Sequence, residues 1–68
     1  MKNHLKVERA RLNFTQQDLA DRLSVSRQTI IAIESGKFNP STQLSLKMAR
    51  LFGLHVEDLF ELEEEDGQ

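Results

Sequence analysis

Two helix-start signals lie eleven residues apart in this chain, and they constrain its fold more than any other feature of the sequence. Thr15 can accept a backbone N–H as an N-cap, and Asp18 three residues later completes a capping box. The apolar Phe14 before this cap supplies a hydrophobic staple. The same arrangement occurs at Ser26, because serine is a good N-cap and the preceding Val25 is again apolar. The sequence therefore predicts two short helices with a joint of three residues between them.

These two helices are expected over 16–23 and 27–35, and Gly36 follows the second one. For the second helix to project from the body, the first must pack closely against it, which requires a small residue at their crossing. Ala20 supplies that residue. Both contact faces also need apolar side chains, and the sequence offers Leu19, Leu23, Val25, Ile30 and Ile33. The helix lengths and the short joint are typical of a helix-turn-helix unit.

Helical periodicity is also present on both sides of this pair. Segment 5–12 predicts a short amphipathic helix that Asn13 ends. Its apolar positions are Leu5, Val7 and Leu12. Ser41 caps a further helix that ends at Gly53, where a left-handed residue is favoured. The apolar positions of this helix follow helical spacing and are Leu44, Met48, Leu51 and Phe52.

The last part of the chain predicts one more helical turn and then a strand. Residues 56–60 suit the turn, and residues 60–63 alternate apolar and charged side chains as a short strand does. The expected fold is therefore all-α, with five helices and a short terminal β element. We assign residues 1–63 to a single domain and residues 64–68 to an acidic disordered tail.

The charges are segregated along the chain. All nine Lys and Arg residues precede residue 51, and only four acids precede residue 57, so that this part carries +5. The remaining residues carry seven acids and no base, which gives them -7. The net charge of -2 therefore hides a basic body that suits nucleic acid and an acidic tail that is expected to be solvated.

Several classes of function are excluded by what the sequence lacks. It has no cysteine, and His4 and His55 are too far apart for a local metal motif, so no metal site is expected. It shows no nucleophile beside a base and no phosphate loop, so we expect neither an enzyme nor a bound cofactor or small-molecule ligand. No apolar run approaches the roughly 18 residues of a membrane span, and a cytoplasmic protein without membrane contact is expected.

Four linked segments resemble the Cro- and cI-type helix-turn-helix regulators, also called the Xre family. The segments are Thr15-Gln16-Gln17-Asp18-Leu19-Ala20, Val25-Ser26-Arg27-Gln28-Thr29-Ile30, Ile33-Glu34-Ser35-Gly36-Lys37 and Asn39-Pro40-Ser41. The resemblance extends from Leu5 to about Leu62 and is greatest to the very short members of the family. It implies a lambda-repressor-like fold and a sequence-specific transcriptional regulator, most often a repressor. It further implies that the helix over 27–35 enters the major groove of double-stranded DNA.

That helix carries the residues expected to contact bases. Arg27 can donate two hydrogen bonds to guanine O6 and N7, and Gln28 can pair with adenine N6 and N7. The later positions that can touch a thymine methyl group or the sugar wall are Thr29, Ile31 and Ala32. Close relatives commonly carry Asn at the position of Ile31, so the operator of a relative cannot be carried over.

Phosphate contacts are expected on both sides of the same helix. The residues that we expect to make them are Arg9, Gln16, Gln17, Ser26, Lys37, Asn39, Ser41 and Thr42. The resemblance further implies a partly buried ion pair between Arg9 and Glu34, for which a chance surface pair is the alternative. Ser24 occupies a turn position that is often Gly, so a left-handed Ser24 would bear about 1 kcal/mol of strain.

The C-terminal part holds more apolar residues than a four-helix body of this size needs to cover. We expect a homodimer whose interface contains Leu54, Val56, Leu59, Phe60 and Leu62. Residues 60–63 would form a strand that pairs with residues 1–4, and packing within one chain is the alternative. A two-fold dimer places its recognition helices roughly 34 Å apart and predicts a near-palindromic operator.

A protein-interaction module is the main alternative of another functional class. In that hypothesis the chain is an antitoxin-like protein, and its acidic tail binds a basic partner protein. A stable complex with the product of an adjacent gene would favour it.

Overall fold

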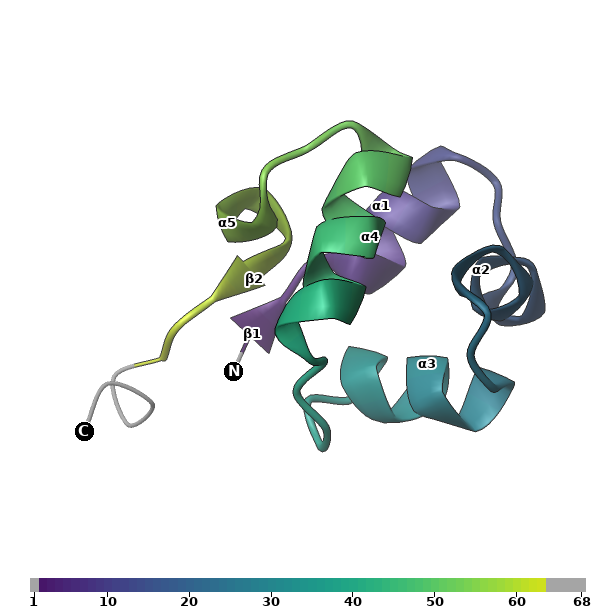
Figure 1. The fold of residues 1–68 in the computed structure, drawn as a ribbon, viewed down its shortest axis with the longest axis horizontal. Coiled ribbons are helices and arrows are strands. Elements are labelled where there is room, and N and C mark those ends of the chain that lie inside the picture. The colour runs from purple at the N-terminus through teal and green to yellow at the C-terminus, as the bar shows by residue number, and fades with distance from the viewer. Residues whose placement is uncertain (1, 64–68) are drawn as a thin grey trace.

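The computed structural model describes residues 2–63, and within them the chain forms five helices and one small sheet (Figure 1). The elements in chain order are β1 (Lys2–Asn3), α1 (Leu5–Arg11), α2 (Gln16–Leu23), α3 (Arg27–Glu34), α4 (Thr42–Phe52), α5 (Val56–Leu59) and β2 (Phe60–Glu61). The predicted all-α fold with a short β element is confirmed. Residues 64–68, which we assigned to the acidic tail, lie outside the described residues. None of the helices among the described residues combines the length and the hydrophobicity that a membrane span requires.

The central helices begin where the sequence signals place them. Thr15 Oγ1 accepts a hydrogen bond from the Asp18 backbone N–H at 3.0 Å, and Asp18 Oδ2 accepts one from the Thr15 N–H at 2.9 Å. Ser26 and Ser41 each accept a bond from the backbone N–H three residues later, both at 3.1 Å. These bonds satisfy donors that the first turn of a helix leaves without an internal partner. The capping box and both serine caps are therefore confirmed.

The joint between α2 and α3 contains a left-handed residue. Ser24 ends α2 with φ 58° and ψ 42°, and the next N–H, that of Val25, donates to the Ala20 carbonyl at 3.0 Å. Residues other than Gly seldom adopt this conformation. Ser24 therefore bears the backbone strain that Gly would avoid. Asn13 (φ 60°) and Gly53 (φ 69°) are also left-handed, after α1 and at the end of α4.

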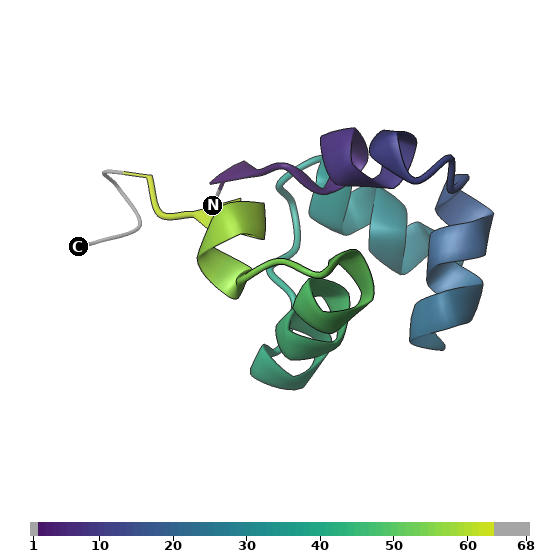
Figure 2. The same cartoon turned by 90° about the horizontal axis from the view of Figure 1, so that it is seen from above.

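The core lies between the α2–α3 pair and the other helices. In Figure 1, α3 runs along the lower edge of the molecule, and the view from above in Figure 2 places α1 and α4 to either side of it. Ala20 is fully buried on α2 and allows α2 and α3 to pack closely. The largest fully buried side chains are Leu5, Leu19, Ile30, Ile33, Met48 and Leu59.

One inward position of the first helix was predicted wrongly. Val7 was expected to face the core together with Leu5 and Leu12, but its side chain is 64% exposed. Two residues along a helix correspond to a rotation of about 200°, so Val7 lies opposite the fully buried Leu5.

The two ends of the described chain meet in a two-stranded antiparallel sheet. Lys2 pairs with Glu61, and Asn3 pairs with Phe60. The N–H of His4 extends this contact by donating to the Leu59 carbonyl at 2.8 Å. The pairing predicted between the chain ends thus occurs within one chain, over two residues in each strand instead of four.

This pairing corrects part of the predicted dimer interface. Leu59 is fully buried and Phe60 is 7% exposed, so both side chains belong to the core of their own chain. They are covered because the sheet holds the C-terminal segment against the body. Leu54 and Val56 are half-buried against the same core, whereas Leu62 is 75% exposed.

Candidate nucleic-acid interface

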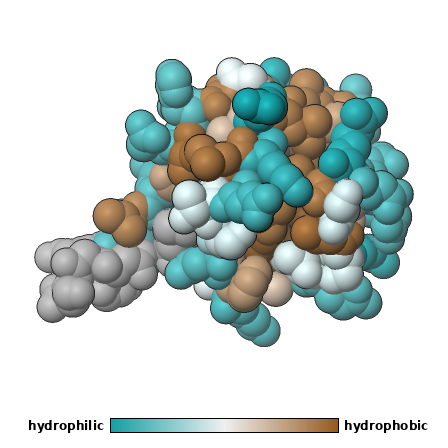
Figure 3. Space-filling view, in the orientation of Figure 1, coloured by the Kyte–Doolittle hydropathy of each residue, from teal (hydrophilic) through white to brown (hydrophobic). Residues whose placement is uncertain are grey.

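The outer face of α3 is not covered by the rest of the described chain. Ile30 and Ile33 fill the core from its inner face. The positions opposite them follow the spacing i, i+3, i+4 and i+7 and are Gln28, Ile31, Ala32 and Ser35. The lower edge of the molecule in Figure 3, over α3 and the loop after it, is largely polar. An external partner can therefore reach this face.

The five predicted base-contacting residues differ in accessibility. Arg27, Gln28 and Ile31 are exposed, while Thr29 and Ala32 are only partly so. Thr29 Oγ1 lies 3.0 Å from Ser26 Oγ, and this hydrogen bond engages its hydroxyl group. Within residues 2–63, the side chains of Arg27 and Gln28 have no hydrogen-bond partner. These two side chains therefore keep their full hydrogen-bonding capacity for a ligand.

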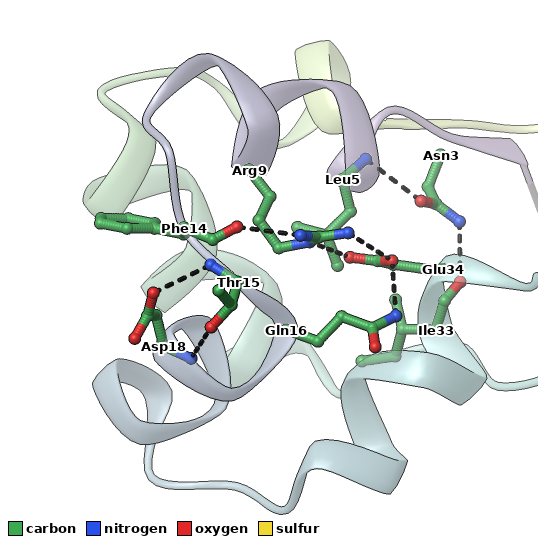
Figure 4. Close-up of polar contacts among 9 residues, drawn as sticks. All are labelled: Asn3, Leu5, Arg9, Phe14, Thr15, Gln16, Asp18, Ile33 and Glu34. Atoms are coloured by element: carbon green, nitrogen blue, oxygen red, sulfur yellow. Dashed lines mark hydrogen bonds and ion pairs between the residues drawn. The ribbon is translucent and has the colours of Figure 1, made fainter.

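A partly buried polar cluster joins the end of α3 to α1 and α2 (Figure 4). Glu34 Oε2 accepts a hydrogen bond from Arg9 Nε at 2.7 Å, and its Oε1 accepts one from Arg9 Nη2 at 3.3 Å. The same Oε1 accepts a bond from Gln16 Nε2 at 3.2 Å. Arg9 also donates from Nη1 to the Phe14 carbonyl at 2.9 Å. The predicted ion pair between Arg9 and Glu34 is thus confirmed and is a specific, three-element contact.

The same cluster borders a depression beside the start of α3. The residues that line it are Arg9, Thr15, Gln16, Gln17 and Arg27. The structure therefore brings together three of the predicted phosphate-contacting residues and one predicted base-contacting residue. Glu34 compensates the charge of Arg9, so the Arg27 guanidinium is the cation in this lining without an anionic partner among the described residues. Together with the N-terminus of α2, it favours an anion here. The Gln17 amide is engaged locally, because Nε2 donates to Asp21 Oδ1 at 2.9 Å.

The second flank consists of the loop after α3 and the start of α4. The predicted phosphate-contacting residues on this side are all exposed, namely Lys37, Asn39, Ser41 and Thr42. The N–H groups of Lys37 and Phe38 both donate to the Ala32 carbonyl, at 3.0 and 3.2 Å. The loop therefore stays close to the C-terminal part of α3.

Two exposed side chains near this flank were not among the DNA-contacting residues predicted from the sequence. Lys47 on α4 lines a depression that Ser24 and Ser41 also line. Lys47 follows the exposed Gln43 by four residues, so both lie on the polar face of α4, and this spacing could have indicated from the sequence that Lys47 is exposed. Phe38 is 49% exposed in the loop after α3.

Asn3, which the sequence analysis also did not identify, contacts the C-terminal end of α3. Asn3 Nδ2 donates to the Ile33 carbonyl at 2.8 Å, and Asn3 Oδ1 accepts the Leu5 N–H at 3.2 Å (Figure 4). Asn3 is thirty residues from Ile33, and no local sequence pattern points to such a contact. The N-terminal strand therefore helps to hold the exposed helix in place.

The carboxylate at the start of α2 is held in its charged form. Hydrogen bonding to Thr15, first through the backbone N–H and then through the side chain, lowers the pKa of Asp18 from its ordinary value of 3.8. A negative charge also suits the first turn of a helix. Throughout residues 2–63, including the start of α2, His, Asp and Glu form no group of three or more that could hold a metal ion.

Two helices joined by a left-handed turn, with the second helix exposed beside basic and polar groups, define a helix-turn-helix domain. The helix-turn-helix family model matches residues 5–59, and the chain belongs to this family. The resemblance to Xre-type proteins found in the sequence is thereby confirmed.

Similar proteins occur in archaea and bacteria. An HTH-type transcriptional regulator of Methanocaldococcus jannaschii is 56% identical over 66 residues, which cover 97% of this chain and all of that protein. One from Archaeoglobus fulgidus is 46% identical over 97% of this chain and 93% of its own length. The HTH-type transcriptional regulator YgzD of Bacillus subtilis is 46% identical over 97% of this chain and its own full length.

Proposed function

We propose that this protein is a sequence-specific DNA-binding transcriptional regulator that represses by occupying a near-palindromic operator as a homodimer. It acts in the cytoplasm and places α3 in the major groove of double-stranded DNA. The observation that carries the proposal is the exposed start of α3, where Arg27 and Gln28 have no hydrogen-bond partner among the described residues, beside the depression that Arg27 lines together with Gln16 and Gln17. The names of the similar proteins support a role in transcription.

Sequence specificity comes from the outer face of α3. Arg27 donates to guanine O6 and N7, and Gln28 pairs with adenine, because both side chains have the matching donor and acceptor geometry. Thr29, Ile31 and Ala32 contact the groove further along the helix. The burial of Ile30 and Ile33 supports this assignment, since it fixes which side of α3 faces outward.

Affinity comes largely from the phosphate backbone on both sides of the groove. One strand contacts Arg9, Gln16 and Gln17 near the start of α2. The other contacts the serine caps and the loop after α3, through Ser26, Lys37, Asn39, Ser41 and Thr42. Cations that replace condensed counterions make binding fall steeply with salt concentration. The hydrogen bonds from Arg9 and Gln16 to Glu34 support this arrangement, because they connect these two residues directly to α3.

The homodimer uses the apolar residues that the chain does not bury in its own core. Leu62 is the main candidate, with half-buried Leu54 and Val56 nearby in the sequence. A two-fold axis would place two copies of α3 roughly 34 Å apart, which is one turn of DNA. Operator occupancy by such a dimer blocks transcription without any further activity.

Selection of bound sites from random double-stranded DNA tests the proposal. The full chain is expected to enrich a two-fold consensus whose half-site centres are about 10 base pairs apart. The logarithm of the association constant for the consensus should fall linearly with the logarithm of the salt concentration. Failure to enrich any sequence, under salt conditions where the chain is folded, would contradict the proposal.

A further inference from the structure

Ile31 is an apolar side chain on the face of α3 that the proposed function turns toward DNA. It is 41% exposed, although Ile30 and Ile33 on the same helix are buried. It follows Arg27 by four residues and Gln28 by three, so it lies one helical turn from both side chains that can donate hydrogen bonds to bases. The exposed face therefore combines two polar side chains with one apolar side chain at a fixed spacing.

The position of Ile31 separates it from other exposed apolar residues. Val7 on α1 and Leu46 on α4 are 64% and 57% exposed, but neither belongs to α3. The other two small or β-branched candidates on α3 are less suited to an apolar contact. Ala32 is partly buried and carries a single methyl group, and the hydroxyl of Thr29 is bonded to Ser26. Ile31 extends furthest from the helix without a polar atom.

The major groove contains one apolar group that distinguishes the bases. Thymine carries a C5 methyl group there, whereas the other base edges carry hydrogen-bond donors and acceptors. An isoleucine placed against those polar edges would exclude the water that is hydrogen-bonded to them and would offer no hydrogen bond in its place. Contact with a methyl group instead removes apolar surface from water on both partners.

We propose that Ile31 makes operator binding depend on a pyrimidine C5 methyl group. This methyl group lies about one α-helical turn, roughly 5 Å, from the bases that Arg27 and Gln28 contact. This inference rests on the proposed function. The ligand class is a 5-methylpyrimidine, which includes 5-methylcytosine because it carries the same methyl group at the same ring position. Methylation of a cytosine at this point of the operator therefore strengthens binding.

Replacing single thymines by deoxyuridine tests the contact, because this change removes one methyl group and leaves the hydrogen-bonding edges of the base pair intact. The operator is the one selected by the full chain from random DNA. Removal of the critical methyl group is expected to weaken binding by about fourfold, the effect of one buried methyl-sized group. One thymine in each half-site should show this sensitivity.

The Ile31→Ala variant identifies the side chain responsible. It is expected to bind the thymine and deoxyuridine operators with equal affinity, because the partner of the methyl group has been removed. Leu46→Ala is the matched control, since it shortens another exposed apolar side chain outside α3, and it should keep the full sensitivity. Both substitutions place a strong helix former on a helix surface, so both variants should fold.

A second arm replaces the critical thymine by cytosine and then by 5-methylcytosine. The methyl group should restore affinity about fourfold for the unchanged chain and not at all for Ile31→Ala. The inference is overturned if no thymine is sensitive to deoxyuridine, or if Ile31→Ala remains as sensitive as the unchanged chain. Both results are distinct from failure of the proposed function, in which the unchanged chain selects no operator.

Discussion

Arg9 on α1 and Glu34 at the end of α3 form an ion pair of two hydrogen bonds, with Nε to Oε2 at 2.7 Å and Nη2 to Oε1 at 3.3 Å. The two side chains are 15% and 7% exposed, so the pair is largely removed from water. Gln16 on α2 donates to the same carboxylate at 3.2 Å. This pair, together with the Gln16 hydrogen bond, therefore connects α3 to both helices that precede it.

Loss of the carboxylate should destabilise the fold strongly. Glu34→Ala leaves the Arg9 guanidinium poorly hydrated and without its anion, and the free energy of unfolding should fall by about 3 kcal/mol. Glu8→Ala is the control, because it breaks the exposed pair with Arg11 and should change stability by about 0.5 kcal/mol. Urea denaturation of both variants measures the difference. Equal losses in the two variants would show that the Glu34 pair has no special structural role.

Substitutions at the two kinds of DNA contact should have different effects. Arg27→Ala is expected to weaken operator binding by about 1 to 3 kcal/mol and to relax the preference at one base position. Lys37→Ala should weaken binding to all sequences alike and reduce the salt slope by about one. Titrations against operator and random DNA at several salt concentrations separate the two outcomes. If neither variant changed operator affinity, α3 would not be the recognition helix.

The left-handed turn offers a stability test with a reciprocal control. Ser24→Gly should raise the free energy of unfolding by about 1 kcal/mol, because Gly adopts φ 58° without the steric clash of a Cβ atom. Gly53→Ala should lower it by about the same amount. A Cβ atom at residue 53 would meet nothing within 4 Å, so the strain there comes from the backbone at φ 69°. Thermal unfolding of both variants checks the opposite signs, and a destabilised Ser24→Gly would contradict the strain.

The capping box should make stability depend on pH through Asp18. Its pKa is lowered in the folded chain by hydrogen bonding to Thr15, so its contribution is fully present above the ordinary value of 3.8. This contribution is lost as the pH falls below 3.8 and through the lower folded pKa. Asp18→Asn should therefore be less stable than the unchanged chain at pH 7, with a gap that narrows below pH 3.8. A gap that stays constant between pH 7 and pH 2 would contradict this linkage.

Self-association should depend on Leu62 and not on other exposed leucines. Leu62 is 75% exposed in the single chain, and its burial at a two-fold interface would occur twice per dimer. Leu62→Ser should therefore weaken dimerisation by at least tenfold, since burial of each leucine contributes about 1.5 kcal/mol or more. Leu46→Ser is the control with an exposed leucine on α4. Analytical ultracentrifugation measures both, and an unchanged dimer in Leu62→Ser would move the interface elsewhere.

Features that depend on neighbouring residues could be predicted from the sequence. The capping box at Thr15, the caps at Ser26 and Ser41, and the left-handed Gly53 all involve hydrogen bonds or backbone angles within about four residues. Such contacts need little chain closure, so the local sequence determines them. The same applies to which side of α3 faces outward, because helical periodicity determines it.

Contacts between distant residues were decided by the tertiary structure. The sequence indicated an excess of apolar residues near the C-terminus, yet only the pairing of Asn3 with Phe60 determined that Leu59 and Phe60 complete the core. The bond from Asn3 to the Ile33 carbonyl also joins residues that the chain alone does not bring together. The reason is that a local pattern fixes the faces of each helix and its ends. Which faces meet depends on how the whole chain excludes water and satisfies its buried hydrogen-bonding groups.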